Sequence, residues 1–232
     1  MIEPRWFIPE LDDPDDMTAQ ERAFAAALSG ATARLVCPGV GDFLIPAEHG
    51  DHGDDALVAG LSFIDSAAEH PLGLMDFGVH YRRGRIRGRV DGGRLHNQLY
   101  SLSGLTPSLG LTATGSVEAL AERTAEWFEA VLARPVVLYV WLHDGYAYAA
   151  RYAFGDTSET LVQCYSAGRA PSGQYDAVIA AGHVRGKGWL QTAGLSTPDL
   201  YFHIRGDLES AAIPAGVRPE TMRGPLPGRW YE

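Results

Sequence analysis

A helical pattern at residues 116–134 runs directly into three strand-like runs, and this succession constrains the fold more than any other part of the chain. In SVEALAERTAEWFEAVLARP the apolar residues recur at the i, i+3, i+4, i+7 spacing of an amphipathic helix. Ser116 has the side chain of an N-cap, Glu118 lies where the helix dipole favours an anion, and Pro135 ends the pattern. We therefore predict one long amphipathic helix over residues 116–134.

The three runs that follow this helix are VVLYVWL, YAYAARYAF and TLVQCYS. They are joined by HDG and GDTSE, which have the turn residues typical of connections between antiparallel strands. Because side chains alternate along a strand, we expect the middle run to carry one aromatic face. Its members are Tyr146, Tyr148, Tyr152 and Phe154. We expect this face to pack with the helix in one core.

Shorter apolar runs upstream indicate further strands. Residues 33–45 suggest two strands around a Pro-Gly turn, residues 56–64 another, and LGLMDFGVHYRR, GRIRGRV, RLHNQLYSL and SLGLTA four more. The 27 glycines and 14 prolines also favour many turns. The sequence thus predicts an α+β fold in which a mainly antiparallel meander sheet is packed by the long helix. A short N-terminal helix over TAQERAFAAALS and an irregular, Pro-rich C-terminus complete the prediction.

The chain is long enough for one large domain or two small ones, and it can bury a sizeable core. We expect a main α+β domain at residues 1–166, beginning with an arm at residues 1–16 whose anchor is Trp-Phe-Ile at 6–8. After the AGRAPSGQ break, residues 167–232 are expected to form an extension packed on the same body. Its candidate strands are DAVIAAGHV, GWLQTA and DLYFHIR.

Charge and composition exclude several classes of protein. The net charge of −10 argues against a general nucleic-acid binder, which needs a basic footprint. Two cysteines cannot supply a disulfide framework. The N-terminus lacks a signal-peptide pattern, and no apolar run approaches the ~20 residues of a membrane span. We therefore expect a cytoplasmic location and no membrane. Eighteen arginines against one lysine are typical of a GC-rich bacterial genome.

A His- and Asp-rich stretch, PAEHGDHGDD, raises the question of a metal site. His49, Asp51 and His52 are of the residue types that bind divalent cations. Their spacing matches neither an EF-hand loop nor the H-E-x-x-H of a zincin, and two glycines oppose a helix here. The sequence favours a solvated loop, and no metal is expected.

The segment YRRGRIRGRVDGGR, residues 81–94, carries six arginines and one aspartate. On a strand, alternate arginines share one face, with Ile86 and Val90 on the other. Guanidinium groups pair bidentately with phosphate or carboxylate, which predicts a site for an anion or a protein partner. The candidate residues are Arg82, Arg83, Arg85, Arg87 and Arg89. The alternative is a solvated sheet face, or one paired with the protein's own acids.

Catalytic signals are weak. His80 and His96 flank the arginine segment, and with Tyr100 they would resemble an acid–base pair for phosphodiester chemistry if the strand register brings them together. The chain has no G-x-S-x-G, P-loop, dinucleotide-binding or kinase motif. We therefore expect no cofactor, and the balance leans away from an enzyme.

These observations favour a non-catalytic cytosolic protein that acts through protein–protein interaction. It would be an accessory or assembly factor that neutralises or scaffolds a partner, as its uneven charge and its aromatic, Pro-rich ends suggest. Such ends need a surface to bury against, either on a partner or on the protein's own body. The alternative is an enzyme that binds a small ligand or phosphate ester with the arginine hairpin and nearby histidines. A third hypothesis is self-association through open strand edges.

Overall fold

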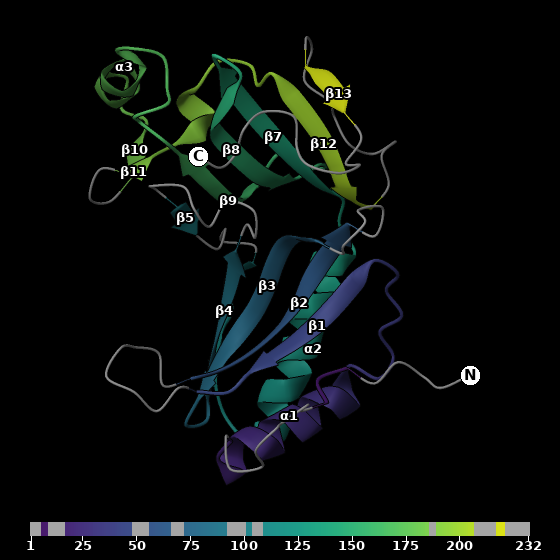
Figure 1. Ribbon diagram of the computed structural model, residues 1–232. Helices are drawn as coiled ribbons and strands as arrows, with labels where there is room; N and C mark the ends of the chain where they lie inside the picture. The colour runs from purple at the N-terminus through teal and green to yellow at the C-terminus, as the bar shows by residue number, and fades with distance from the viewer. Residues whose placement is uncertain are drawn as a thin grey trace.

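A computed structural model describes residues 6–8, 17–47, 56–65, 72–91, 101–103, 109–185, 189–206 and 217–220. Within these residues the fold is α+β, with three α-helices, two large and mainly antiparallel sheets, and a separate two-stranded ribbon (Figure 1). The expectation of one dominant sheet is therefore wrong. The strands divide between two sheets because pairing is set by contacts between segments far apart in the chain, which local patterns do not contain.

The first sheet is a five-stranded antiparallel meander in the order β1-β2-β3-β4-β6. Its strands are β1 (Val40–Ile45), β2 (Leu57–Asp65), β3 (Leu72–Arg82), β4 (Arg85–Asp91) and β6 (Thr112–Thr114). The β3–β4 turn has positive φ at Arg83 and Gly84, as a two-residue type I′ hairpin requires. Of the two strands predicted within residues 33–45, only β1 forms. Before it, the carbonyl of Leu35 accepts a hydrogen bond from the Trp6 indole instead of a strand partner.

Two helices cover one face of the first sheet. In Figure 1, α2 (Val117–Leu132) runs behind β1, β2 and β3, and α1 (Ala19–Ala31) packs against α2. Thr18 and Glu21 form a capping box at the start of α1, and the Ser116 hydroxyl caps α2. No described helix is long and apolar enough to cross a membrane.

The second sheet has the order β13-β12-β7-β8-β9-β5. Its strands are β5 (Ser101–Ser103), β7 (Val136–His143), β8 (Tyr146–Phe154), β9 (Thr160–Tyr165), β12 (Leu200–Arg205) and β13 (Arg218–Glu220). All its pairs are antiparallel except β12–β13. The three consecutive strands predicted after the helix are thus confirmed as β7, β8 and β9. Residues from 221 onward, part of the predicted Pro-rich C-terminus, lie outside the described residues.

Smaller elements cover the face of the second sheet that points away from the first sheet. They are α3 (Gln174–Ala180), a ribbon of β10 (Val184–Arg185) and β11 (Trp189–Leu190), and a 3-10 turn, η4 (Thr192–Gly194). The prediction of a strand in DAVIAAGHV is therefore wrong for the residues that form α3. A short apolar run does not distinguish a buried strand from one face of a short helix.

A bulge in β8 overturns the single aromatic face predicted for residues 146–154. The β7–β8 pairing shifts by one residue at positions 141–142, which leaves Tyr148 as an extra residue in β8. Tyr148 therefore packs in a core on one side of the sheet, whereas Tyr152 and Phe154 pack in a core on the other. A shift of one residue is enough to exchange faces because side chains alternate along a strand.

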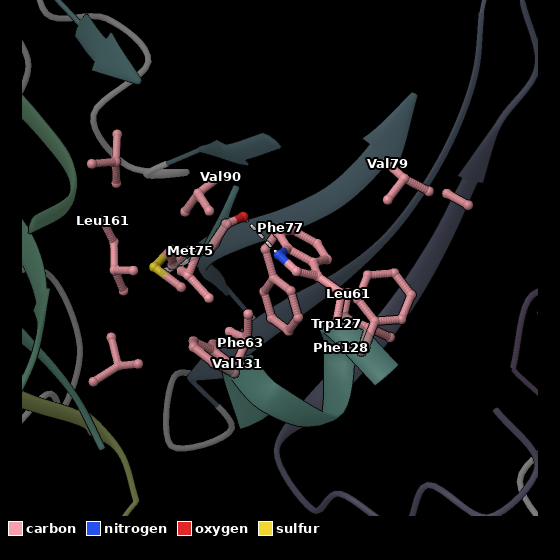
Figure 2. Close-up of a cluster of buried hydrophobic side chains, with 14 of the residues drawn as sticks. Leu61, Phe63, Met75, Phe77, Val79, Val90, Trp127, Phe128, Val131 and Leu161 are labelled. Carbon is pink, nitrogen blue, oxygen red and sulfur yellow. Dashed lines mark hydrogen bonds between the residues drawn. The ribbon is translucent and has the colours of Figure 1, made fainter. Parts of the chain in front are cut away.

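The two sheets share one hydrophobic cluster, which we call the first core. Figure 2 shows its contributors from both sheets and from α2, including Met75, Val131 and Leu161. At the junction, the buried Tyr152 hydroxyl of β8 donates a 2.5 Å hydrogen bond to the carbonyl of Leu74 in β3. The β2–β3 ladder skips Leu74 at a bulge and the β3–β4 ladder begins beyond it, so this carbonyl lies outside both ladders.

The described part of the N-terminal arm docks on the protein's own body. Trp6 and Phe7 are buried, whereas Ile8 is 51% exposed. The Trp6 indole donates to the carbonyl of Leu35 at 2.9 Å, and the Phe7 ring stacks on Phe128 with centroids 5.7 Å apart. These two aromatic residues therefore give no support to docking on a partner.

Candidate functional site

The arginine segment forms a β-hairpin whose side chains alternate as predicted. Along β4, Ile86 and Val90 are buried, whereas Arg85, Arg87 and Arg89 are exposed. The buried residues join the first core. The arginines therefore project from the opposite face of the first sheet, away from α2.

The strand register adds two residues of β3 to this surface. His80 lies opposite Arg87 and Arg82 lies opposite Arg85, and residues paired across strands share a face. We call the surface formed by His80, Arg82, Arg85, Arg87 and Arg89 the basic face. Arg83 is exposed at the adjoining turn.

Toward β1, the same side of the sheet becomes apolar, whereas the row next to Arg89 and Gly78 carries Asp76, which accepts a hydrogen bond from the Ser62 hydroxyl. The row through Arg89 continues across Gly78 and Gly60 to Phe43 of β1, and a Cβ added at Gly60 would clash with the Phe43 ring. The phenyl ring therefore lies over the backbone of β2. In the neighbouring row, Ile45 is 51% exposed at the sheet edge.

This side of the first sheet carries no described helix. In Figure 1 the strands face the viewer and α2 lies behind them. An antiparallel sheet commonly buries one face and presents the other to water, so an open face alone does not indicate a function. The four arginines on it, in a chain with a net charge of −10, are the unusual feature.

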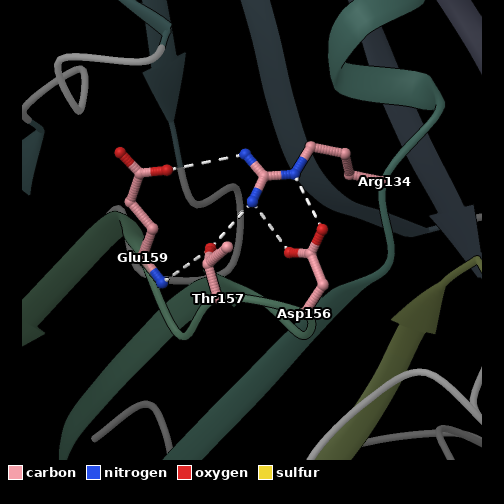
Figure 3. A network of polar contacts seen from close by, with 4 residues as sticks. All are labelled: Arg134, Asp156, Thr157 and Glu159. Carbon is pink, nitrogen blue, oxygen red and sulfur yellow. Dashed lines mark hydrogen bonds and ion pairs between the residues drawn. The ribbon is translucent and has the colours of Figure 1, made fainter.

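An arginine elsewhere shows how this chain pairs guanidinium groups with its own acids. Arg134 lies 2.8 Å from Asp156 and 3.5 Å from Glu159, and it donates to the Thr157 hydroxyl at 2.7 Å (Figure 3). Hydrogen bonding to Arg134 lowers the pKa of the Asp156 carboxyl. The guanidinium also stacks 3.5 Å from the centroid of the Phe154 ring.

Arg85 and Arg87 differ from Arg134. Neither forms an ion pair or a hydrogen bond with its side chain in the described part of the protein. His80, Arg82 and Arg89 do make polar or ring contacts. Pairing of the hairpin with the protein's own acids is thus not found at Arg85 and Arg87 among the described residues.

The other predicted site residues lie outside the described part of the chain. These are the acid–base candidates His96 and Tyr100 and the metal candidates His49, Asp51 and His52. The encounter of His80 with His96 therefore stays a prediction. Among the residues that are described, no group of three or more His, Cys, Asp or Glu side chains is placed to hold a metal ion.

One polar row was not predicted. Tyr201, Tyr139, Arg151 and Gln163 occupy successive paired positions across β12, β7, β8 and β9. The signal for it was Arg151, the single charged residue in the apolar run YAYAARYAF. A charge within a strand that is otherwise apolar marks a buried polar contact or a site.

The chemistry available to the basic face is anion binding. Arg85 and Arg87 are two residues apart on one strand, a spacing of roughly 7 Å. Each guanidinium presents a planar fork that matches a carboxylate or phosphate. Comparison with known proteins found no family model, no curated protein and no solved structure that matches this chain.

Proposed function

We propose that this is a non-catalytic cytoplasmic protein that binds an acidic segment of a protein partner on its basic face, as an accessory or assembly factor. One observation carries the proposal: Arg85 and Arg87 are exposed side by side, and neither has an ion-pair partner among the described residues. The locally positive surface attracts the complementary charge of a partner. The acidic remainder of the chain repels other copies of the protein.

The geometry favours an extended partner segment. Alternate residues of an extended chain recur at roughly 7 Å, the same spacing as Arg85 and Arg87. Two carboxylates at such positions would each meet one guanidinium. Phe43 and Ile45 lie on β1, farther along the same side of the sheet, and would accept hydrophobic side chains from a flanking part of the partner, which gives contact area beyond the charge pairs.

A second candidate function rests on the pairing of His80 with Arg87. An imidazole directly opposite a guanidinium is suited to a phosphate ester, with arginine binding the phosphate and histidine transferring a proton. This function is an enzyme that uses the same face for a small phosphorylated ligand.

A peptide-binding experiment separates these functions. The probe is a fluorescent peptide of alternating Glu and Val, and its control replaces every Glu by Gln. We expect the Glu peptide to bind the wild-type protein, with affinity that falls as salt rises. The double variant Arg85→Glu/Arg87→Glu should bind at least tenfold more weakly. Arg123→Glu, an exposed position on α2, is the matched control and should bind like wild type.

Equal binding of the Glu and Gln peptides, or equal binding by the double variant, would overturn the proposal. Binding of phenyl phosphate at the basic face, with no binding of the Glu peptide, would favour the phosphate-ester function. A tagged protein purified at its natural level then identifies the partner. A stoichiometric second protein should co-elute with wild type and Arg123→Glu and be lost from the double variant.

A further inference from the structure

A face of the second sheet, opposite to the first core, holds a buried row of polar side chains. Tyr201, Tyr139, Arg151 and Gln163 lie next to one another across four strands. The face is covered in part by α3 and η4, and it forms a second hydrophobic cluster, the second core. Arg151 is half-buried, and its guanidinium carbon lies 4.9 Å from the centroid of the Tyr139 ring.

Most polar groups around this row have partners. Gln163 accepts hydrogen bonds from the backbone and hydroxyl of Thr192. The Trp141 indole donates to the carbonyl of Ser196 at 2.7 Å. On α3, Gln174 donates to the Tyr148 hydroxyl at 3.0 Å and accepts from the Tyr165 hydroxyl at 3.2 Å. The fold therefore satisfies the hydroxyls of two buried tyrosines on this face.

Among the described residues, the hydroxyls of Tyr139 and Tyr201 have no such partner. These tyrosines are 0% and 1% exposed. Their hydroxyls, Nε of Arg151 and Nε2 of His203 are buried and make no hydrogen bond within the part of the chain that the structure describes. A buried polar group without a partner is costly, and natural proteins contain few of them. Here four of them occur on one face of one sheet, since His203 lies two residues from Tyr201 on β12.

Arg151 adds a charge to this group. No carboxylate of the described residues forms an ion pair with it. Burial lowers its pKa, and burial likewise raises the pKa of the Tyr201 hydroxyl. A buried charge is retained where it is paired or where it has a function, because leaving it unpaired is unfavourable.

We propose that this row binds the anionic head group, a carboxylate or a phosphate, of a small organic ligand. The hydroxyls of Tyr139 and Tyr201 and Nε–H of Arg151 are donors, so they require an acceptor, and the guanidinium favours one that is negatively charged. The aromatic rings of Tyr139 and Trp141 flank the guanidinium and provide contact for an organic body. This site lies on a different sheet from the basic face and is independent of the proposed function.

The test measures ligand-induced stabilisation with defined probes. Benzoate and phenyl phosphate carry the head group and an aromatic body, inorganic phosphate lacks the body, and benzamide lacks the charge. The melting temperature of the protein is recorded at increasing concentrations of each probe, up to concentrations that saturate a site with a Kd of about 1 mM. Calorimetry then measures the affinity of each probe that stabilises the protein. We expect benzoate or phenyl phosphate to raise the melting temperature saturably. Benzamide should not, and inorganic phosphate should do so less than phenyl phosphate.

Two variants assign the response to this row. Tyr139→Phe removes one donor and keeps the ring, so it should weaken binding about tenfold. Its control is Tyr175→Phe, which removes a hydroxyl that makes no hydrogen bond with the described residues. Arg151→Met should abolish the response. The ligand-free variant should melt no lower than wild type, because it removes a half-buried charge that has no ion-pair partner among the described residues.

Three results would overturn the proposal. The first is a wild-type protein that responds to none of the probes. The second is an Arg151→Met variant that responds like wild type, which would place the binding elsewhere. The third is a Tyr139→Phe variant with unchanged affinity. Arg85→Glu/Arg87→Glu should keep the full response, so failure at this site and failure at the basic face are distinguishable.

Discussion

Replacing Tyr152 by phenylalanine would remove one hydroxyl from the junction between the two sheets. That hydroxyl donates a 2.5 Å hydrogen bond to the carbonyl of Leu74, which a bulge has placed outside the ladders of its own sheet. Both residues are buried, at 0% and 4% exposure. In the variant the ring would still fill its place in the first core, whereas the Leu74 carbonyl would lose this donor.

The expected cost follows from the environment of the bond. Leaving a buried acceptor without its partner costs about 1–3 kcal/mol, more than the net value of an exposed hydrogen bond. In a chain of this size 1 kcal/mol lowers the melting temperature by roughly 2–4 °C, so we expect a decrease of about 2–12 °C. This is a considerable part of the ~5–15 kcal/mol by which folded domains are stable.

Urea unfolding followed by tryptophan fluorescence and by circular dichroism checks this prediction. The midpoint should fall in Tyr152→Phe, with an unchanged slope, and the two probes should give coincident transitions because both sheets share the first core. Tyr175→Phe is the matched control and should stay within ~0.5 kcal/mol of wild type. A Tyr152→Phe midpoint equal to that of the control would refute the inferred bond. Separate transitions would refute the shared core.

Two further predictions concern titratable groups. Burial raises the pKa of the Cys164 thiol to about 12, whereas Cys37 is only half-buried. At pH 8 a disulfide reagent should modify only Cys37 in the native protein, and it should modify both thiols in urea. Rapid modification of both thiols in the native protein would contradict this prediction. Arg134 lowers the pKa of Asp156, so its stabilisation is present above the unfolded pKa of ~3.9 and is lost as pH falls through the lowered value. Asp156→Asn should therefore lower the free energy of unfolding in urea at pH 7, by under about 1 kcal/mol for this partly exposed pair, and should leave it unchanged at pH 2. An equal loss at both pH values would contradict this prediction.

Local patterns were sufficient where a structure depends on neighbouring residues alone. The β3–β4 hairpin needed a turn that tolerates positive φ, and RRG provides it at Arg83 and Gly84. The alternation of Arg85, Ile86 and Arg87 then set which side chains are exposed. The candidate basic face could therefore be drawn from the sequence, although the residues that border it could not.

The bordering residues depend on pairing between distant strands. Phe43 reaches the row of Arg89 only through the β1–β2 and β2–β3 registers. Likewise, the bulge at Tyr148 reverses the faces of β8, and no residue type in YAYAARYAF marks it. The row through Arg151 has members from β7 to β12, far apart in the chain, so only the folded sheet brings them together.

The position of β7 in its sheet has a consequence for how the chain reaches this fold. One edge of β7 pairs with β8 through a short hairpin, but its other edge pairs with β12, so that Val140 lies opposite Leu200. During synthesis VVLYVWL therefore emerges long before the strand that covers it. Until then this uncharged, β-branched and aromatic stretch presents an open edge, the type of segment that associates with other chains. Slower translation after β9 would prolong that exposure, so yield of the protein in a host should depend on how quickly β12 follows.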